Sequence, residues 1–139
     1  GTLGAAATSN VPGARRSAVA WTDSQGNFWL FGGAENNPAN PFGSDNLNDL
    51  WKYGNDPATA SNYQKWVWMS GSNTPNQPGI YGTLGGTVPP ESANVPGARD
   101  VAVSWSSKGK FWLFSGQVVV QPNNFSTVPY NDLWSFVPK

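Results

Sequence analysis

The fold is decided by the stretch Gly26-Asn27-Phe28-Trp29-Leu30-Phe31-Gly32-Gly33. Four large apolar residues in a row, opened by a Gly-Asn turn and closed by two glycines, predict a short β-strand rather than a helix. Because the apolar run shows no alternation with polar residues, we expect this strand to be buried on both faces.

This stretch belongs to an internal duplication. Its core returns as Phe111-Trp112-Leu113-Phe114, with Trp112 lying 83 residues after Trp29. Val11–Arg15 returns as Val95–Arg99, and Asn48–Tyr53 returns as Asn131–Phe136. A repeat at a fixed period indicates two copies of one structural unit, and the small changes of offset between matched blocks are expected in loops.

The composition is that of a folded chain made of strands and turns. Of its 139 residues, 38% are hydrophobic and eight are Trp, which is too apolar for a disordered chain. The 16 glycines and 12 prolines suit many short strands joined by turns. We therefore expect an all-β protein.

Charge and motifs exclude several classes of partner. Eight Lys and Arg balance eight Asp and Glu, so neither nucleic acid nor an anionic membrane surface is an expected partner. No apolar run approaches the about 18 residues of a transmembrane helix. The first residue is Gly1 rather than Met, and we expect a processed product or a fragment.

Each unit is expected to hold four short strands. In the first unit they are residues 15–21, 27–31, 50–53 and 65–69, with polar linking segments at 34–47 and 54–64. In the second unit the three copied strands are expected at 99–105, around 111–114 and within 131–136. Segment 117–130 links the last two of them, and the unit has no copy of the fourth strand. The expected division is a first unit with its loops at 1–94 and an incomplete second unit at 95–139.

The side chains grow in bulk from the first strand of a unit to its last. Ala18, Val19 and Ala20 lie in the first strand, whereas Trp66 and Trp68 lie in the fourth. Strands arranged radially crowd at the axis and diverge at the rim, so this gradient favours a blade of a β-propeller. The expected fold is thus a propeller segment of about two four-stranded antiparallel blades, the second lacking its fourth strand.

These residues resemble the kelch family. The resemblance lies in Arg15 at the start of the first strand, in Trp29–Gly33, in Asn48–Tyr53 and in the fourth-strand Trp66 and Trp68. The chain looks like the galactose-oxidase-like, long-spaced kelch repeats of large bacterial proteins, and we expect an extracellular or cell-surface protein. Ser115 departs from the family's Gly-Gly pair, and the repeat is longer than the about 50 residues usual for kelch.

The long connections are expected to carry any binding site. In an antiparallel blade, segments 34–47 and 71–98 leave from the same end, and the resemblance implies that this end binds a partner. Amide and aromatic side chains suited to sugars occur there, although a plain solvated loop is the alternative: Asn36, Asn37, Asn40, Phe42 and Asp45, with Asn123, Asn124 and Phe125 in the second unit. Asp45 and Asp56 sit in no recognisable calcium-loop pattern, and Asn124–Ser126 fits a glycosylation sequon.

The residue types leave little room for catalysis. Without His or Cys the chain offers no imidazole base, no thiolate and no usual zinc or copper ligand set, and we expect no catalytic residue, cofactor or metal. Asp49 and Asp132 precede matched strands, which favours a turn or cap over a glycosidase-like carboxylate pair. Arg15 and Arg99 are expected to bond backbone carbonyls rather than to grip an anion.

The tryptophans are expected to fill the space between blades. Trp29, Trp51, Trp112 and Trp134 are predicted core residues, and Trp66 and Trp68 are expected to point in different directions.

Three functions remain open from the sequence. The first is a non-enzymatic binding or structural module, whose partner is either further blades of the same polypeptide or other copies of the chain. This follows because two units cannot close a ring of about four to eight blades. The second is a carbohydrate-binding propeller, and the third is a non-catalytic part of a galactose-oxidase-like enzyme.

Overall fold

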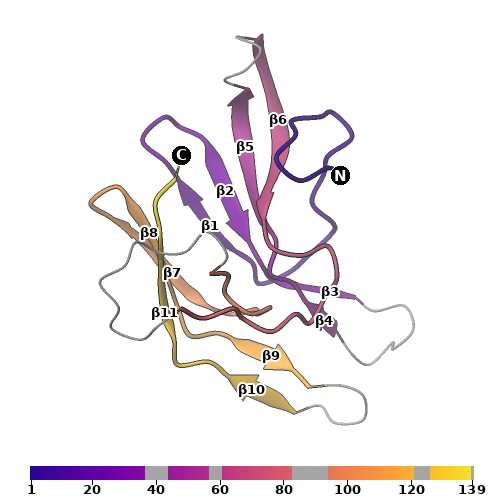
Figure 1. Ribbon diagram of the computed structural model, residues 1–139, viewed down its shortest axis with the longest axis vertical. Helices are drawn as coiled ribbons and strands as arrows, with labels where there is room; N and C mark the ends of the chain where they lie inside the picture. The colour runs from indigo at the N-terminus through magenta and orange to yellow at the C-terminus, as the bar shows by residue number, and fades with distance from the viewer. Residues whose placement is uncertain (37–43, 57–60, 83–93, 121–125, 139) are drawn as a thin grey trace.

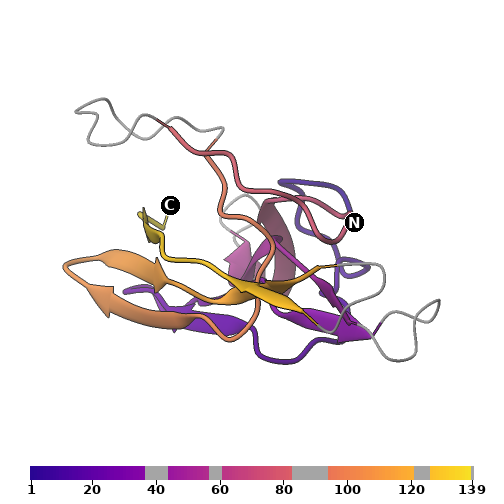
Figure 2. The same ribbon diagram turned by 90° about the horizontal axis from the view of Figure 1, so that it is seen from below.

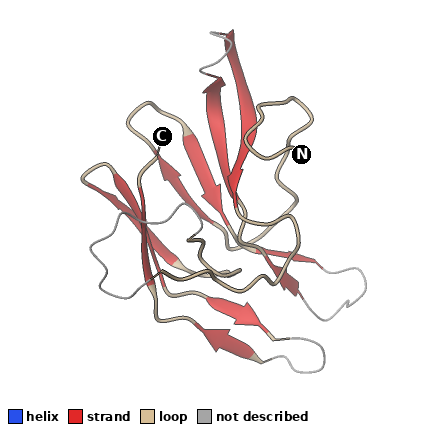
Figure 3. Ribbon diagram, in the orientation of Figure 1, coloured by secondary structure: helices blue, strands red, loops and turns tan. Residues whose placement is uncertain are grey.

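The described part of the chain consists of strands, turns and loops. The computed structural model describes residues 1–36, 44–56, 61–82, 94–120 and 126–138, and in these ranges it holds β-strands and no helix (Figures 1 and 3). The prediction of an all-β chain is confirmed. No helix long and apolar enough to span a membrane is found in the same ranges. The described strands form several separate sheets and do not close into a propeller ring.

The first sheet has the four predicted strands in the predicted order. They are β1 (Val19–Thr22), β2 (Phe28–Phe31), β5 (Leu50–Asp56) and β6 (Ser61–Ser70), arranged β1-β2-β5-β6 with every neighbour antiparallel. β5 and β6 run further than predicted, so most of segment 54–64, which we expected to be a loop, is a continuation of this hairpin. The first unit is therefore one antiparallel sheet.

The second sheet repeats three of these strands. They are β7 (Val103–Ser107), β8 (Lys110–Phe114) and β11 (Leu133–Phe136), arranged β11-β8-β7. The register is also repeated, because Trp105 pairs with Trp112 as Trp21 pairs with Trp29. The duplication seen in the sequence is thus a duplication of strand pairing.

The polar linking segments contain hairpins that we did not predict. β3 (Ala34–Asn36) pairs with β4 (Ser44–Asn46), and β9 (Gln117–Val119) pairs with β10 (Thr127–Pro129). Gly32 and Gly33 have positive φ angles of 63° and 95°, which turn the chain out of the sheet before β3 begins. Ser115 adopts a φ of 61°, so the departure from the Gly-Gly pair leaves the backbone turn unchanged.

The first strand of each unit starts later than predicted. Ser17 and Val101 have positive φ angles of 54° and 47°, which interrupt an extended strand. Arg16 instead forms an isolated bridge with Ala34. Arg15 and Arg99 therefore lie in the turns ahead of β1 and β7, not at the first residues of these strands.

The main core lies between the two sheets, which face each other in Figure 2. We call this contact the seam. Its first-sheet side is a row of buried side chains, namely Val19, Trp21, Trp29, Phe31 and Leu50, and its second-sheet side is centred on Phe111 and Leu113. Trp21 stacks on Phe111 with ring centres 5.2 Å apart and planes 9° apart, and Trp29 has no exposed surface. Burial of so many aromatic side chains is the main stabilising contribution.

Several predictions about burial are wrong, and for Phe28 and Trp112 the reason is that these side chains point away from the facing sheet. β2 was expected to be buried on both faces, but Phe28 is 39% exposed. Trp112 and Trp134 were expected in the core and are only half-buried, whereas Trp29 and Trp51 are buried as predicted.

Trp66 and Trp68 do not point in different directions. Residues two apart on a strand share a face, and both indole rings lie against Trp51, with ring centres 6.4 and 6.2 Å away.

A short segment of the second unit holds the two sheets in register. We call Ala98–Val101 the junction segment. The Arg99 N–H donates to the Leu47 carbonyl at 3.0 Å, and the Gly33 N–H donates to the Arg99 carbonyl at 2.9 Å. The backbone of the second unit is thus bonded to the first.

Gly32 is the position at which a side chain would disturb this junction most directly. A Cβ there would lie 2.8 Å from the Arg99 carbonyl oxygen, and the φ of 63° already disfavours other residues. We predict that Gly32→Ala lowers the free energy of unfolding by about 2–3 kcal/mol in urea titrations, the sum of backbone strain and overpacking. Gly4→Ala is the control, because Gly4 has a φ of 74° and open space around it. Equal losses in the two variants would contradict the close contact at Gly32.

Candidate interaction surface

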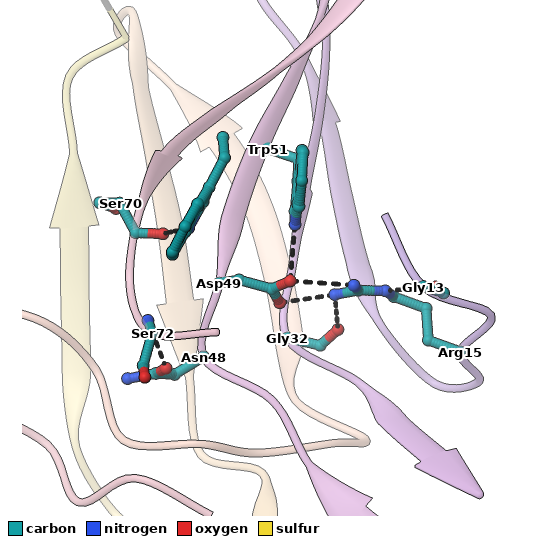
Figure 4. A network of polar contacts seen from close by, with 9 residues as sticks. Gly13, Arg15, Gly32, Asn48, Asp49, Trp51, Ser70 and Ser72 are labelled. Atoms are coloured by element: carbon teal, nitrogen blue, oxygen red, sulfur yellow. Dashed lines mark hydrogen bonds and ion pairs between the residues drawn. The ribbon is translucent and has the colours of Figure 1, made fainter. Parts of the chain in front are cut away.

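Arg15 and Asp49 form a buried ion pair that ties the first unit together. The guanidinium donates to both carboxylate oxygens of Asp49, at 2.6 and 2.9 Å, and to the carbonyls of Gly13 and Gly32 (Figure 4). Asp49 also accepts a hydrogen bond from the Trp51 indole at 2.6 Å. The predicted backbone bonds of Arg15 are present, and the pairing with Asp49 is an addition that sequence reasoning missed.

The second unit repeats this arrangement around Arg99. Its side chain is 1% exposed, and it donates to Asp132 at 2.5 and 2.8 Å and to the carbonyls of Gly97 and Ser115. Trp134 donates to the same carboxylate at 2.8 Å, and Tyr81 does so at 2.8 Å. The Arg99 guanidinium also lies 4.0 Å from the centre of the Tyr130 ring. Each carboxylate is held by a cation and an indole, which suits a structural tie.

The two described residues of the predicted sugar-binding set do not form one surface. Asn36 ends β3 and accepts a hydrogen bond from Arg16 at 3.1 Å, and Asp45 in β4 accepts one from Asn76 at 2.8 Å. Asn36 pairs with Ser44 and Asp45 pairs with Glu35, so successive pairs point to opposite faces of the hairpin. The other six members lie outside the described residues: Asn37, Asn40, Phe42, Asn123, Asn124 and Phe125. Two of them, Asn124 and Phe125, are the first two residues of the sequon.

In the described ranges, no group of three or more His, Cys, Asp or Glu side chains is placed to hold a metal ion. Asp45 is bonded to an amide, and Asp56 is the last residue of β5.

An amide cluster joins the two hairpins. Asn46 is fully buried; its side-chain oxygen accepts the Val119 N–H at 2.8 Å, and its own N–H donates to the side-chain oxygen of Asn76 at 2.8 Å. The Asn76 N–H returns a bond to the Asn46 carbonyl at 2.7 Å. These contacts link β4, β9 and the segment after β6. The many asparagines of the linking segments were the sequence signal for such a cluster. Their spacing did not reveal which of them would bond to each other.

The largest unexplained feature is the uncovered side of the second sheet. We call it the open face, and its members are Val103, Trp105, Trp112, Phe114 and Leu133, which the strand register places on one side. Val103 is 59% exposed, Trp105 42%, Phe114 42% and Leu133 55%. Trp105 and Trp112 stack on each other with planes 2° apart. Monomeric proteins rarely expose a contiguous apolar face of this kind.

The side of the first sheet that points away from the seam is also apolar. We call it the rear face, and it includes Phe28, Leu30 and Tyr53. Trp66 and Trp68 of β6 lie on the same side and pack against Trp51, which is 6% exposed. Phe28 contacts the edge of Trp66, 6.1 Å away, and retains an exposed ring. The stack of two sheets therefore ends in an apolar face on both sides.

A hollow lies at the inner edge of the seam, between β1 and β7. Trp21, Phe28 and Trp105 line it together with the hydroxyl-bearing residues Thr22, Ser104 and Ser106. Aromatic rings beside hydroxyl groups can hold a small polar ligand by stacking and hydrogen bonds.

Comparison with known proteins adds no relative: no family model, no curated protein and no solved structure matches the chain.

Acid should weaken the tie at Asp132. Burial alone would raise the pKa of this carboxyl, but hydrogen bonds from Arg99, Trp134 and Tyr81 outweigh it and lower the pKa to about 2, below the ordinary value of 3.8. A lowered pKa means that the ionised carboxylate stabilises the fold above about pH 4 and that this stabilisation is lost as the pH falls toward 2. We predict that urea unfolding of the wild type shows this loss.

Asp132→Asn should be less stable than the wild type at pH 5, and the difference should shrink as the pH falls to 2. Asp45→Asn is the control, since Asp45 contacts an amide rather than a cation. A constant difference between wild type and Asp132→Asn from pH 5 to pH 2 would show that the carboxylate charge does not stabilise the fold.

Proposed function

We propose that the chain is a non-enzymatic kelch-type propeller segment that serves as a protein-binding or structural module of a larger or oligomeric extracellular or surface protein. The observation that carries this proposal is the open face, an apolar sheet surface that ends a stack of two repeated units. Proteins use such faces to join other folded units, because covering them removes apolar surface from water.

The repeated structure supports the kelch-type part of the proposal. Each unit has an Arg–Asp–Trp tie, with Arg15, Asp49 and Trp51 in the first and Arg99, Asp132 and Trp134 in the second. The innermost strands β1 and β7 lie close together, as neighbouring wedges of a ring would place them. The carboxylates that sequence reasoning considered for catalysis are already bonded to arginine and tryptophan, which supports the non-enzymatic part.

A carbohydrate-binding module is the second candidate. The hollow between β1 and β7 favours it, because Phe28 and Trp105 offer exposed ring surfaces and Thr22 and Ser104 offer hydroxyl groups. Binding there would involve the inner edge of the seam rather than the predicted asparagine-rich hairpin loops.

A dye that binds apolar surface tests the proposed function. We predict that anilinonaphthalene sulfonate fluoresces with the wild-type chain and that Val103→Lys, which places a charge on the open face, lowers this signal, while the rear face continues to bind the dye. Val11→Lys is the matched control, because Val11 is 65% exposed but lies in the loop before β1. Equal signals from the two variants would contradict an apolar binding face on the second sheet.

A glycan array separates the two candidates. The proposed function predicts no signal on any glycan, whereas a carbohydrate-binding module predicts a saturable signal that Trp105→Ala weakens. Saturable binding would replace the proposed function with the second candidate.

A further inference from the structure

The open face repeats, residue for residue, the side of the seam that is buried in the first unit. Val19, Trp21, Trp29, Phe31 and Leu50 are each at most 8% exposed. Their repeat equivalents are the five identical residues of the open face: Val103, Trp105, Trp112, Phe114 and Leu133. The second sheet therefore presents to solvent the surface that the first sheet uses to bind its neighbour.

The rear face repeats the opposite side of the seam. Phe28 is the equivalent of Phe111, Leu30 of Leu113 and Tyr53 of Phe136. Phe111 is 3% exposed in the seam, whereas Phe28 on the rear face is 39% exposed. The two ends of the stack are thus complementary in these residues, while Trp66 and Trp68 on the rear face have no equivalent in the described second sheet.

From this juxtaposition we propose that the open face of one copy of the chain docks on the rear face of a second copy, head to tail, by the contacts seen in the seam. The inference rests on the proposed function, since it names the partner of the open face. The two faces are different surfaces, so the contact is heterologous and each added copy leaves a free open face and a free rear face.

The seam shows which rings should meet. Trp21 stacks on Phe111 at 5.2 Å, which places Trp105 of one copy on Phe28 of the next. Trp29 lies 5.8 Å from Phe111 and 5.3 Å from Phe136. Trp112 should accordingly pack beside Phe28 and Tyr53 of the next copy, and Trp66, which contacts both of these rings, must shift to admit it.

The first unit contains a counterpart of the junction segment, around Arg15. The Arg15 side chain donates to the same three kinds of acceptor as the Arg99 side chain. These are the carbonyl two residues earlier, the carbonyl at the first position of the Gly-Gly pair or its Ser115 equivalent, and the carboxylate of the aspartate in the same unit. The Arg15 backbone is therefore presented in the same way. In the docked pair the Arg15 N–H would reach the Tyr130 carbonyl, as the Arg99 N–H reaches that of Leu47.

Ser115 makes the contact between copies weaker than the seam. A Cβ at the equivalent Gly32 would lie 2.8 Å from the Arg99 carbonyl oxygen, and Ser115 carries such a Cβ. Its hydroxyl already donates to the Tyr130 carbonyl at 2.9 Å. The incoming Arg15 backbone must shift to fit, so Ser115 limits the affinity of one copy for the next.

Complementing variants test the proposal with the full 139-residue chain. Trp105→Lys blocks the open face and Phe28→Lys blocks the rear face, both at exposed positions. In sedimentation velocity we expect concentration-dependent assemblies of the wild type, and for each variant alone a loss of affinity of more than about 30-fold. An equimolar mixture of the two variants should form a dimer, because it retains one intact pair of faces.

Ser115→Gly is expected to tighten the self-association of the wild type by at least about fivefold. Circular dichroism of every variant checks that the sheets are retained. A wild type that stays monomeric, or a mixture that fails to form the dimer, would overturn docking between copies. The dye and glycan results would then still decide the proposed function, since they do not depend on a second copy. Dimers formed equally by either variant alone would show a different, non-repeating contact and would also overturn the proposal.

Discussion

The structure depends on the position of Arg99 between the two units. Its guanidinium is buried and bonded to Asp132 in the second unit, while its backbone N–H and carbonyl bond to Leu47 and Gly33 in the first. A buried cation is tolerated only when its partners are present and well aligned. One residue therefore fixes the internal geometry of the second unit and its register on the first. The same tie, built from Arg15 and Asp49, stands at the start of the first unit.

Apolar packing stabilises the contact between the two sheets, and the bonds of Arg99 fix the register in which they pack. Aromatic rings such as Trp21, Trp29 and Phe111 remove a large area from water at the seam. Because the sequence of one unit is repeated in the next, each sheet carries two apolar faces, and the described structure leaves the open face and the part of the rear face around Phe28 exposed. The binding surface inferred for this chain is a direct consequence of the repeat: what packs once inside the chain is presented again at its ends.

The sequence predicted the strands of the two main sheets, their order and the duplication, because these follow from apolar runs and turn residues over short distances. The prediction from sequence failed where a single backbone dihedral angle decides where a strand begins or the chain turns. The positive φ of Ser17 delays β1, and the turn at Gly32–Gly33 lets segment 34–47 form a hairpin. It also failed where partners lie far apart, since nothing in the sequence joins Arg15 to Asp49, 34 residues away, beyond their shared recurrence. The sugar-binding set was chosen by composition alone, and register places Asn36 and Asp45 on different faces.

The most direct test is a set of nuclear Overhauser contacts between aromatic protons in the isotope-labelled chain. The account predicts contacts between Trp21 and Phe111 and between Trp29 and Phe136, whose ring centres lie 5.2 and 5.3 Å apart. Cross-strand contacts between Trp21 and Trp29 serve as the internal reference for an intact first sheet. Presence of the reference contacts without the Trp21–Phe111 and Trp29–Phe136 contacts would contradict the packing of the two sheets at the seam.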